Sequence, residues 1–361
     1  MKILIDGHML GKKEGGNERY IKNLALGLIK QSQRKNQIKI TTNKDYFLNQ
    51  KVFSTNNLLK INYENDFYRI FYFLPKSLDL GKYDIIHSTY IAPHPSYSKS
   101  VVTVHDLSFK RYPYFYSLKE KIIFNYLLPS SLLRAKAIIV PSQFTKNEFL
   151  RFFPQYKNKV FVVYEGIDMH FFNIDKDEAK KKIEKKYGIY DPFFLAFNSK
   201  NPKKNINVII KAFKKLQNWS SKLKLVIIGG KNNIKVKNLD YIYFLSNIPD
   251  EDLNFLYNVC EIFLSSSIYE GFNLPIIEAL KTKTIVMAAD IKVNRELYDD
   301  AVIYFNPHND VQIEEIVKKV LKNPEIVRKK IINQYNKITD KFDWEKNTKK
   351  MLEIYQRINQ K

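Results

Sequence analysis

The stretch SSSIYEGFNLPIIEAL, residues 265–280, joins the end of one predicted strand to the start of one predicted helix. Three serines close an apolar run, a polar loop that holds Glu270 follows, and Pro275 stands where the helix would open. Proline is tolerated in a first helical turn, because the N–H groups there have no partner within the helix. A buried strand that passes through a short loop into a helix is the repeating unit of parallel α/β sheets. The stretch therefore predicts an α/β fold.

The same loop carries groups that suit a ligand. The free N–H groups of Asn273, Leu274 and Ile276, together with the helix dipole, are predicted to form an anion-binding site. Glu270 lies before the helix and Glu278 within its first turns, so both carboxylates can face one ligand. Carboxylates only accept hydrogen bonds, which suits the paired hydroxyls of a sugar or a ribose. One Glu at a helix start is usually a cap, but two of them around a glycine loop favour a binding site.

Short apolar runs alternate with longer amphipathic stretches along the whole chain. The predicted strands are residues 2–5, 38–41, 83–87, 101–105, 137–141 and 160–164, and then 193–197, 224–230, 241–245, 261–267, 284–288 and 301–305. Continuous apolar strands separated by helices indicate parallel sheets that are covered on both faces. Two such sets predict two Rossmann-like, doubly wound α/β domains that face a cleft, with ligands at the carboxyl ends of the strands.

The length of 361 residues also favours two domains, because it exceeds what one core usually holds. We place the boundary near EGID, residues 165–168, which follows a strand. The first domain is predicted to span 1–165 and the second 166–343. The final segment, 344–361, has the pattern of an amphipathic helix that can pack back on the first domain.

The composition restricts the compartment and the cofactors. Cys260 is the only cysteine, which excludes a disulfide framework and a Cys-rich zinc site. The opening MKILIDGHML reads as a strand rather than a signal peptide, and no apolar run is long enough to span a bilayer. We therefore expect a cytoplasmic protein, either free or attached peripherally to the inner face of the cytoplasmic membrane.

The formal net charge of +23 suits a polyanionic partner. The alternative is that the charge only reflects a lysine-rich composition. Residues 107–159 concentrate the basic character, with ten Lys or Arg, two acidic residues and twelve aromatics. Basic and aromatic residues together suit the interface of an anionic membrane. They would also suit nucleic acid, but no nucleic-acid-binding module is recognisable and we expect no nucleic-acid partner.

We predict no metal site and no cofactor. Asp250-Glu251-Asp252 imitates a metal-binding D-x-D motif, but the Pro249 before it favours an acidic first helical turn. His87 ends a strand and could line the cleft, although a structural role is the more common one for such a histidine.

The E-x7-E spacing of Glu270 and Glu278 resembles the motif of retaining glycosyltransferases of the GT-B fold, in particular glycosyltransferase family 4 (the group 1, mannosyltransferase-like enzymes). The rest of the chain resembles the same family in order. The matching segments are residues 105–121, 134–153, 201–213 and 248–267. The resemblance implies a two-domain enzyme in which the second domain binds a nucleotide sugar and the first receives the acceptor.

The resemblance also implies roles for individual residues. Glu270 would bind hydroxyls of the donor sugar, Glu278 the nucleotide ribose, and Lys204 the diphosphate. His105 would contact the donor sugar near the reacting carbon. The loop that holds Gly15 and Gly16 would let backbone N–H groups approach the diphosphate, and the helix after it points its N-terminus the same way. The remaining predicted donor-binding residues are Ser199, Lys203, Phe272, Asn273 and Leu274.

Three positions depart from the family pattern. Many members carry an arginine a few residues before the lysine, where this chain has Asn198-Ser199-Lys200. We expect the Ser199 hydroxyl to donate a hydrogen bond there and Lys203 to supply the second charge. Asn273 stands where the family usually has glycine, and Glu165 where it often has asparagine, so either can alter donor choice.

The resemblance implies hexosyl transfer with retention of configuration, in cell-envelope polysaccharide synthesis. Mannose from GDP-mannose is the first expectation and a UDP-sugar the next, with a saccharide or lipid-linked acceptor. No carboxylate is placed as a nucleophile, which favours front-face transfer in which a donor phosphate oxygen takes the acceptor proton. One alternative is a GT-B enzyme of another specificity, such as an epimerase-like or soluble-acceptor enzyme. Another is a degenerate GT-B protein that acts as a basic membrane- or nucleic-acid-binding module.

Overall fold

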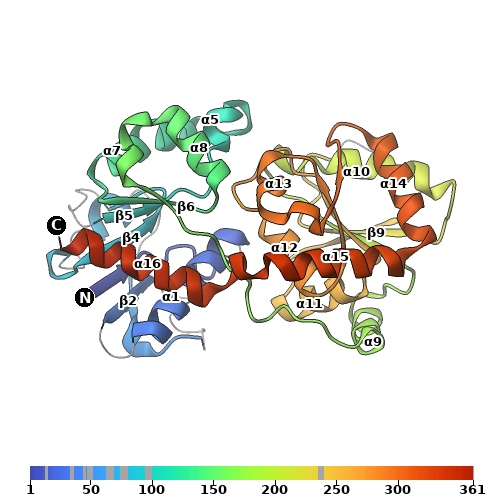
Figure 1. The fold of residues 1–361 in the computed structure, drawn as a ribbon, viewed down its shortest axis with the longest axis horizontal. Helices are drawn as coiled ribbons and strands as arrows, with labels where there is room; N and C mark the ends of the chain where they lie inside the picture. Colours follow the sequence, from blue (N-terminus) through green and yellow to red (C-terminus); the bar gives the residue numbers. More distant parts are fainter. Residues whose placement is uncertain are drawn as a thin grey trace. The chain divides into compact units, whose positions relative to one another are not determined.

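The computed structural model describes residues 1–12, 15–32, 36–43, 46, 52–61, 69–73, 80–93, 100–234 and 240–360. The chain forms two compact units. The first comprises Met1–Gly166 together with Lys341–Lys361, and the second comprises Ile167–Asp340 (Figure 1). The first unit thus ends one residue after the predicted boundary, and the final helix belongs to it, together with the three residues before that helix.

The first unit is built on a seven-stranded parallel sheet in the order β3-β2-β1-β4-β5-β6-β7. Its strands are β1 (Lys2–Ile5), β2 (Gln37–Thr42), β3 (Leu58–Lys60), β4 (Ile85–Thr89), β5 (Ser100–Thr103), β6 (Ala137–Val140) and β7 (Val160–Val162). Its α-helices are α1 (Gly16–Ser32), α5 (Ser108–Arg111), α6 (Leu118–Ile122), α7 (Leu128–Arg134), α8 (Gln143–Phe152) and α16 (Trp344–Asn359). Short 3-10 turns η1 (Thr55–Asn57), η3 (Leu80–Lys82), η4 (Pro113–Phe115), η6 (Pro154–Lys159) and η9 (Thr339–Phe342), and the π-helical turns η2 (Arg69–Phe73) and η5 (Ile123–Leu127), connect them.

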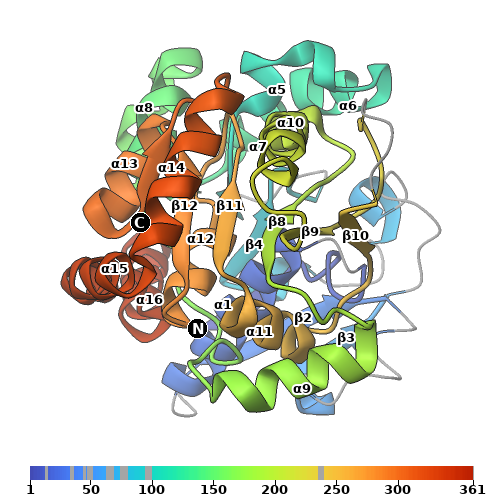
Figure 2. The same ribbon diagram turned by 90° about the vertical axis from the view of Figure 1, so that its right-hand side faces the viewer.

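The second unit is built on a six-stranded parallel sheet in the order β10-β9-β8-β11-β12-β13 (Figure 2). Its strands are β8 (Phe193–Phe197), β9 (Lys224–Ile228), β10 (Ile242–Leu245), β11 (Ile262–Ser265), β12 (Ile285–Ala289) and β13 (Ile303–Phe305). Its helices are α9 (Lys176–Tyr187), η7 (Pro202–Lys204), α10 (Ile206–Gln217), α11 (Asp250–Val259), α12 (Leu274–Lys281), α13 (Lys292–Tyr298), η8 (Asp299–Ala301), α14 (Asp310–Lys322) and α15 (Pro324–Ile338).

Helices cover both faces of each sheet, as a doubly wound fold requires. In the first unit α1 and α16 lie on one face and α7 and α8 on the other (Figure 1). In the second unit α10 and α14 lie on one face, and α11, α12 and α15 on the other (Figures 1 and 2). The predicted fold class, two Rossmann-like α/β domains, is confirmed. Each sequence-predicted strand overlaps one in the structure, whereas β3, only three residues long, was not predicted.

The final helix α16 completes the core of the first unit. Asp343 caps it by accepting hydrogen bonds from the N–H groups of Glu345 and Lys346. Its apolar face, which includes Met351 and Tyr355, packs into the same cluster as α1 and β1. At Gly27 in α1 an added Cβ would lie 2.4 Å from Oγ1 of Thr348 in α16, so the two helices approach too closely for any larger residue.

A buried histidine ties α16 to the sheet. His87 in β4 is fully buried, and its Nδ1 shares a hydrogen bond with the Tyr355 hydroxyl. Its Nε2 lies 2.7 Å from Oγ1 of Thr103 in β5. Burial and the neighbouring His105 lower the pKa of His87 to about 3. Both ring nitrogens are thus used within the core, which confirms the structural interpretation of this residue.

No helix in the described ranges is long and apolar enough to cross a bilayer.

We predict that His87 makes the first unit less stable as the pH falls from about 6.5 toward 4.5. Its pKa is about 3 in the folded state and near 6.5 in the unfolded state, so over this range only the unfolded chain binds the proton. The free energy of unfolding should fall by up to about 1.4 kcal/mol per pH unit. Urea unfolding at several pH values, followed by Trp344 fluorescence in a Trp219→Phe background, measures this slope.

The control is His87→Gln, which cannot titrate and should show a flatter dependence over the same range. Equal slopes for both proteins would show that other groups control the acid sensitivity.

Candidate functional site

The second sheet reverses its strand order between β8 and β11, and the predicted donor-binding residues follow these two strands. Residues 198–204 come after β8, and residues 266–274 come after β11. Ligands of open parallel sheets bind at the carboxyl ends of the strands next to such a reversal. The carboxyl edge of β8 and β11 is therefore the candidate site of the second unit.

Glu270 lies between two lysines at this edge. Lys204 Nζ donates to Glu270 Oε1 at 2.7 Å, and Lys203 Nζ lies 3.5 Å from Oε2. The three side chains are 20%, 14% and 10% exposed, in the order Lys204, Lys203, Glu270. Two ammonium groups around one carboxylate leave a local excess of positive charge in a poorly hydrated place, which favours an anionic ligand.

Local backbone contacts hold both lysines in position. Asn201 caps η7 by accepting from the N–H of Lys203 at 3.1 Å. The carbonyl oxygen of Lys203 accepts from the N–H of Ile268 at 2.9 Å, and that of Lys204 accepts from the Ser266 hydroxyl at 2.8 Å. The loop after β8 and the loop after β11 are therefore bonded into one structure.

Asn273 precedes α12 in a left-handed conformation, with φ of 70°. This explains why glycine is common at the position, since only small or amide residues adopt such angles readily. The Asn273 side chain donates to Ser265 Oγ at 3.0 Å and to Asn294 Oδ1 at 3.3 Å. Its carbonyl oxygen accepts from the Tyr298 hydroxyl at 3.0 Å. An asparagine therefore bonds the loop to β11 and α13.

One element of the predicted anion site is wrong. The N–H of Ile276 is not free, because it donates to the carbonyl oxygen of Asn273 at 3.0 Å in a tight first turn. The N–H groups of Asn273 and Leu274 remain the predicted donors. The side chains of Phe272 and Leu274 are buried, so any ligand contact by these two residues falls to their backbone.

Glu278 lies within α12 and is 1% exposed. Its Oε2 accepts a hydrogen bond from the Tyr257 hydroxyl at 3.1 Å. Glu278 is therefore held by a neutral donor, whereas Glu270 is held by cations. The two glutamates of the E-x7-E spacing have different environments, a difference that the spacing alone did not indicate.

Ser199 closes its own loop instead of pointing freely outward. Its hydroxyl donates to the Asn201 carbonyl and accepts from the Asn201 N–H, both at 3.2 Å. Asn198 joins this loop to the one after β9 by donating to the carbonyls of Gly230 and Asn232 at 2.7 and 2.9 Å. Gly229 was missed from the sequence: its φ is +112°, and an added Cβ would lie 2.3 Å from the Asn198 carbonyl oxygen.

In the first unit His105 follows β5, and its Nδ1 lies 3.0 Å from Glu165 Oε1. The Tyr20 ring meets the imidazole edge-on, with the ring centroids 4.6 Å apart. Gly15, with φ of +71°, precedes α1, and Gly16 is the first residue of that helix. Glu18, in the first turn of α1, accepts from the Gly11 N–H at 2.7 Å and fixes part of the loop that leads to the two glycines.

A buried ionic cluster at the end of β1 was also missed from the sequence. Asp6 contacts Arg69, lies 3.3 Å from His8 Nδ1, and accepts from the Thr41 hydroxyl at 3.3 Å. Burial by itself would raise the pKa of Asp6, but Arg69 and His8 hold it well below its usual range. Because Thr41 and Arg69 lie far from Asp6 in the chain, no local pattern pointed to the cluster.

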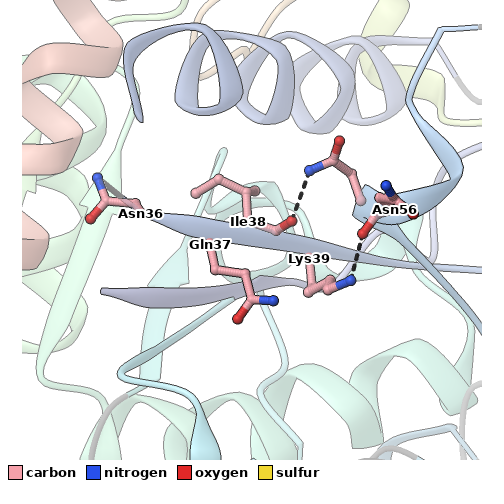
Figure 3. Close-up of a pocket in the computed structure, with 6 residues that line it drawn as sticks. Asn36, Gln37, Ile38, Lys39 and Asn56 are labelled. Carbon is pink, nitrogen blue, oxygen red and sulfur yellow. Dashed lines mark hydrogen bonds between the residues drawn. The ribbon is translucent and has the colours of Figure 1, made fainter. Parts of the chain in front are cut away.

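Two surface hollows lie outside the predicted site residues. One, of about 500 Å³, is lined by Asn36, Gln37, Ile38, Lys39, Asn56 and Asn57 (Figure 3). It begins at the amino end of β2, opposite the edge where parallel sheets bind ligands. The other, of about 530 Å³, follows β12 and β13, and the Arg295–Asp290 ion pair lines it.

Within the described ranges, no group of three His, Cys, Asp or Glu side chains could hold a metal ion. The D-x-D imitation is an acidic first turn, as expected, because α11 begins at Asp250. Asp252 accepts a hydrogen bond from the Tyr187 hydroxyl at 2.5 Å, so it acts within the fold.

Two family models match the chain in tandem. "Glycosyltransferase Family 4" matches residues 14–171, and "Glycosyl transferases group 1" matches residues 176–337. The chain belongs to the group 1 glycosyltransferases. The family resemblance noted in the sequence is thereby confirmed. The expectation that the protein is a glycosyltransferase is confirmed with it.

Curated relatives agree. The O-antigen chain mannosyltransferase RfbU of Salmonella typhimurium is 27% identical over 72% of this chain and 69% of its own length. O-antigen chain mannosyltransferase B of Escherichia coli is 25% identical over 59% of this chain, and WbdA of the same species is 26% identical over 63%. The matched parts are 58% and 29% of those two proteins, so the alignments span only part of their length.

Solved structures establish the GT-B fold of this group 1 glycosyltransferase. The sucrose-phosphate synthase of Thermosynechococcus elongatus aligns with a TM-score of 0.76 at 17% identity, over 99% of both chains. WaaG, a glycosyltransferase of lipopolysaccharide biosynthesis, aligns with a TM-score of 0.74 at 12% identity, over 98% of this chain and 99% of its own.

Proposed function

We propose that this glycosyltransferase moves a hexosyl group from a nucleoside-diphosphate sugar to a saccharide or lipid-linked acceptor in cell-envelope glycan synthesis. The observation that carries the proposal is the Glu270 carboxylate between Lys203 and Lys204 at the strand reversal of the second sheet. The names of RfbU and WbdA make mannose the first choice of sugar.

The second domain would hold the donor. Lys203 and Lys204 would neutralise the diphosphate, and Glu270 would accept hydrogen bonds from sugar hydroxyls. Glu278 would bind the ribose, with Tyr257 orienting its carboxylate. Since Lys204 already bonds Glu270, one ion pair would link the charge of the diphosphate to the position of the sugar.

We infer a retaining, front-face transfer in which these residues stabilise developing charge. As the glycosidic bond breaks, the leaving diphosphate gains negative charge next to two ammonium groups, and the sugar carbon gains oxocarbenium character. Fixed charges in a poorly hydrated site stabilise such changes more than water does. The acceptor proton would pass to an oxygen of the leaving phosphate.

We predict that substitution of the two glutamates affects different kinetic parameters. Glu278→Gln should chiefly weaken binding of the donor and of the free nucleoside diphosphate, because the ribose is bound alike in ground and transition states. Glu270→Gln should slow kcat by about 100- to 1,000-fold, as for other electrostatic catalytic groups. It should leave diphosphate affinity intact, because both lysines remain. Steady-state kinetics and calorimetry with GDP and UDP measure both effects.

The matched control is Glu261→Gln, which removes a carboxylate that pairs with Lys176 just before β11. It should leave rates and affinities near those of the wild type. Normal rates and affinities in both site variants would refute the assignment of the E-x7-E pair. A chain that binds no nucleotide sugar at all would instead be a degenerate GT-B protein.

We further propose that transfer needs no divalent cation, because Lys203 and Lys204 already supply two positive charges for the diphosphate. Activity should persist in excess EDTA and should not rise on addition of Mg²⁺ or Mn²⁺. Activity lost in EDTA and restored by either ion would overturn this.

We also propose that the first domain docks on an anionic membrane, which would bring it to a lipid-linked acceptor. The predicted basic, aromatic face of residues 107–159 is only partly a surface, since Phe109, Phe149, Phe153 and Tyr156 are buried in the core. Large apolar side chains are nevertheless 59% to 79% exposed along η4 to α7: Tyr114, Leu118, Ile122, Tyr126 and Leu133.

Three of these exposed residues follow each other along one helical stretch. Leu118, Ile122 and Tyr126 are spaced at intervals of four, which places them near one side of the consecutive helical segments α6 and η5. Lys119 lies exposed between them. Exposed apolar groups flanked by lysine suit the headgroup region of an anionic bilayer.

We predict that the protein co-sediments with vesicles of phosphatidylglycerol and phosphatidylcholine, and that binding falls steeply with salt. Each lysine near such a surface contributes about 1 kcal/mol, which salt screens. The double variant Leu118→Ser/Ile122→Ser should bind several-fold more weakly. Ile326→Ser, which alters an equally exposed residue in the second domain, should bind like the wild type. Equal binding to neutral and anionic vesicles would contradict the proposal, because the basic charge would then reflect only the lysine-rich composition of the chain.

A further inference from the structure

Glu165 and His105 form a buried pair at the carboxyl edge of the first sheet. Glu165 follows β7 and His105 follows β5, and β6 lies between these strands. Glu165 Oε1 is 3.0 Å from His105 Nδ1, and the two side chains are 5% and 11% exposed. The contact therefore reaches across the end of β6 and is shielded from water.

The surroundings of His105 leave its ring little freedom. The Tyr20 ring from α1 stands edge-on at 4.6 Å, and Tyr90, which follows β4, lies with its ring centroid 5.9 Å away. Tyr20 is itself fixed, because its hydroxyl bonds Thr103 Oγ1 at 2.9 Å. His87 is another titratable neighbour of His105, and both of its ring nitrogens are already engaged by Thr103 and Tyr355.

The segment that carries Glu165 is held by the final helix. An added Cβ at Gly166 would lie 2.4 Å from Cγ of Trp344, the first residue of α16. The Trp344 ring also lies 6.0 Å from that of Tyr20, between centroids. Trp344 thus packs against the backbone next to Glu165 and against the Tyr20 ring.

The chemistry of the pair decides which ring nitrogen carries hydrogen. An ionised carboxylate only accepts, so His105 Nδ1 must be the donor. His105 Nε2 is buried and has no hydrogen-bond partner among the described residues. Leaving a buried polar atom unpaired costs about 1–3 kcal/mol, a cost that a substrate hydroxyl, or water in its place, would remove.

We propose that Glu165 is a positioning residue that keeps the hydrogen of His105 on Nδ1 and so presents Nε2 to the substrate. In the neutral ring Nε2 then accepts a hydrogen bond from a donor-sugar hydroxyl. This role rests on the proposed transfer reaction, in which His105 contacts the sugar. The state of the ring itself does not depend on that reaction.

The first test is the tautomer of His105 in the free protein, read from side-chain ¹⁵N chemical shifts at pH 8. The chain has only six histidines, and His105→Asn assigns the signal. The wild type should show the Nδ1–H form. Glu165→Gln, whose amide can also donate to Nδ1, should show the Nε2–H form in part or in full. A wild-type ring in the Nε2–H form would overturn the proposal.

The second test is kinetic. Glu165→Gln should lower kcat by about 10- to 100-fold, as loss of an orienting partner usually does, with little change in the KM for the donor. Glu148→Gln removes another buried carboxylate of this unit, one that pairs with Arg111, and should keep normal rates and the Nδ1–H form. A changed tautomer with unchanged kcat would also overturn the proposal.

The two tests separate the two ideas. If the wild type transferred no sugar from any nucleotide sugar, the proposed function would fail. The ¹⁵N spectra would still decide whether Glu165 sets the tautomer.

Discussion

A carboxylate as buried as that of Glu270 must be paired, and the second domain is arranged around that requirement. Burying an unpaired charge costs several kcal/mol, a large part of the stability of a domain, so Lys203 and Lys204 are structural needs as well as candidate ligands. To bring them there, the loop after β8 must bond the loop after β11, which it does through Ser266 and Ile268. The strand reversal between β8 and β11 makes this meeting possible, because it leaves their carboxyl ends adjacent.

The architecture could be predicted from the sequence because each buried parallel strand has a recognisable local pattern of apolar residues. Each apolar run was long enough and rich enough in branched residues to indicate a buried strand, and the order of runs and helices implied two doubly wound sheets. β3 was not predicted because a strand of only three residues, Leu58–Lys60, is too short to show a pattern of apolar residues. The contacts that place α16 could not be predicted from local sequence. The close approach of Gly27 to Thr348 and the His87–Tyr355 hydrogen bond join residues about 270 or more positions apart.

The candidate site was only partly predictable for the same reason. Motif spacing indicated Glu270, Glu278 and Lys204, but it could not show that one glutamate is bound by lysines and the other by Tyr257. It also led to one error, the free N–H of Ile276, because a helix start can tighten and bond its own first turn. The need for glycine at 229 and the Asp6–Arg69 ion pair both depend on contacts with segments distant in the chain, which a local sequence pattern cannot show.

The three departures from the family pattern share a property that only the structure shows. Ser199 bonds both backbone groups of Asn201, Asn273 bonds Ser265 and Asn294, and Glu165 bonds His105. Each altered side chain therefore satisfies a polar group inside its own domain. Changes of this kind adjust how rigidly a site is held without removing its charges, because the lysines, both E-x7-E glutamates and the histidine are all retained. Donor choice would then depend on the exact placement of these retained groups, which Asn273 sets in the second domain and Glu165 in the first.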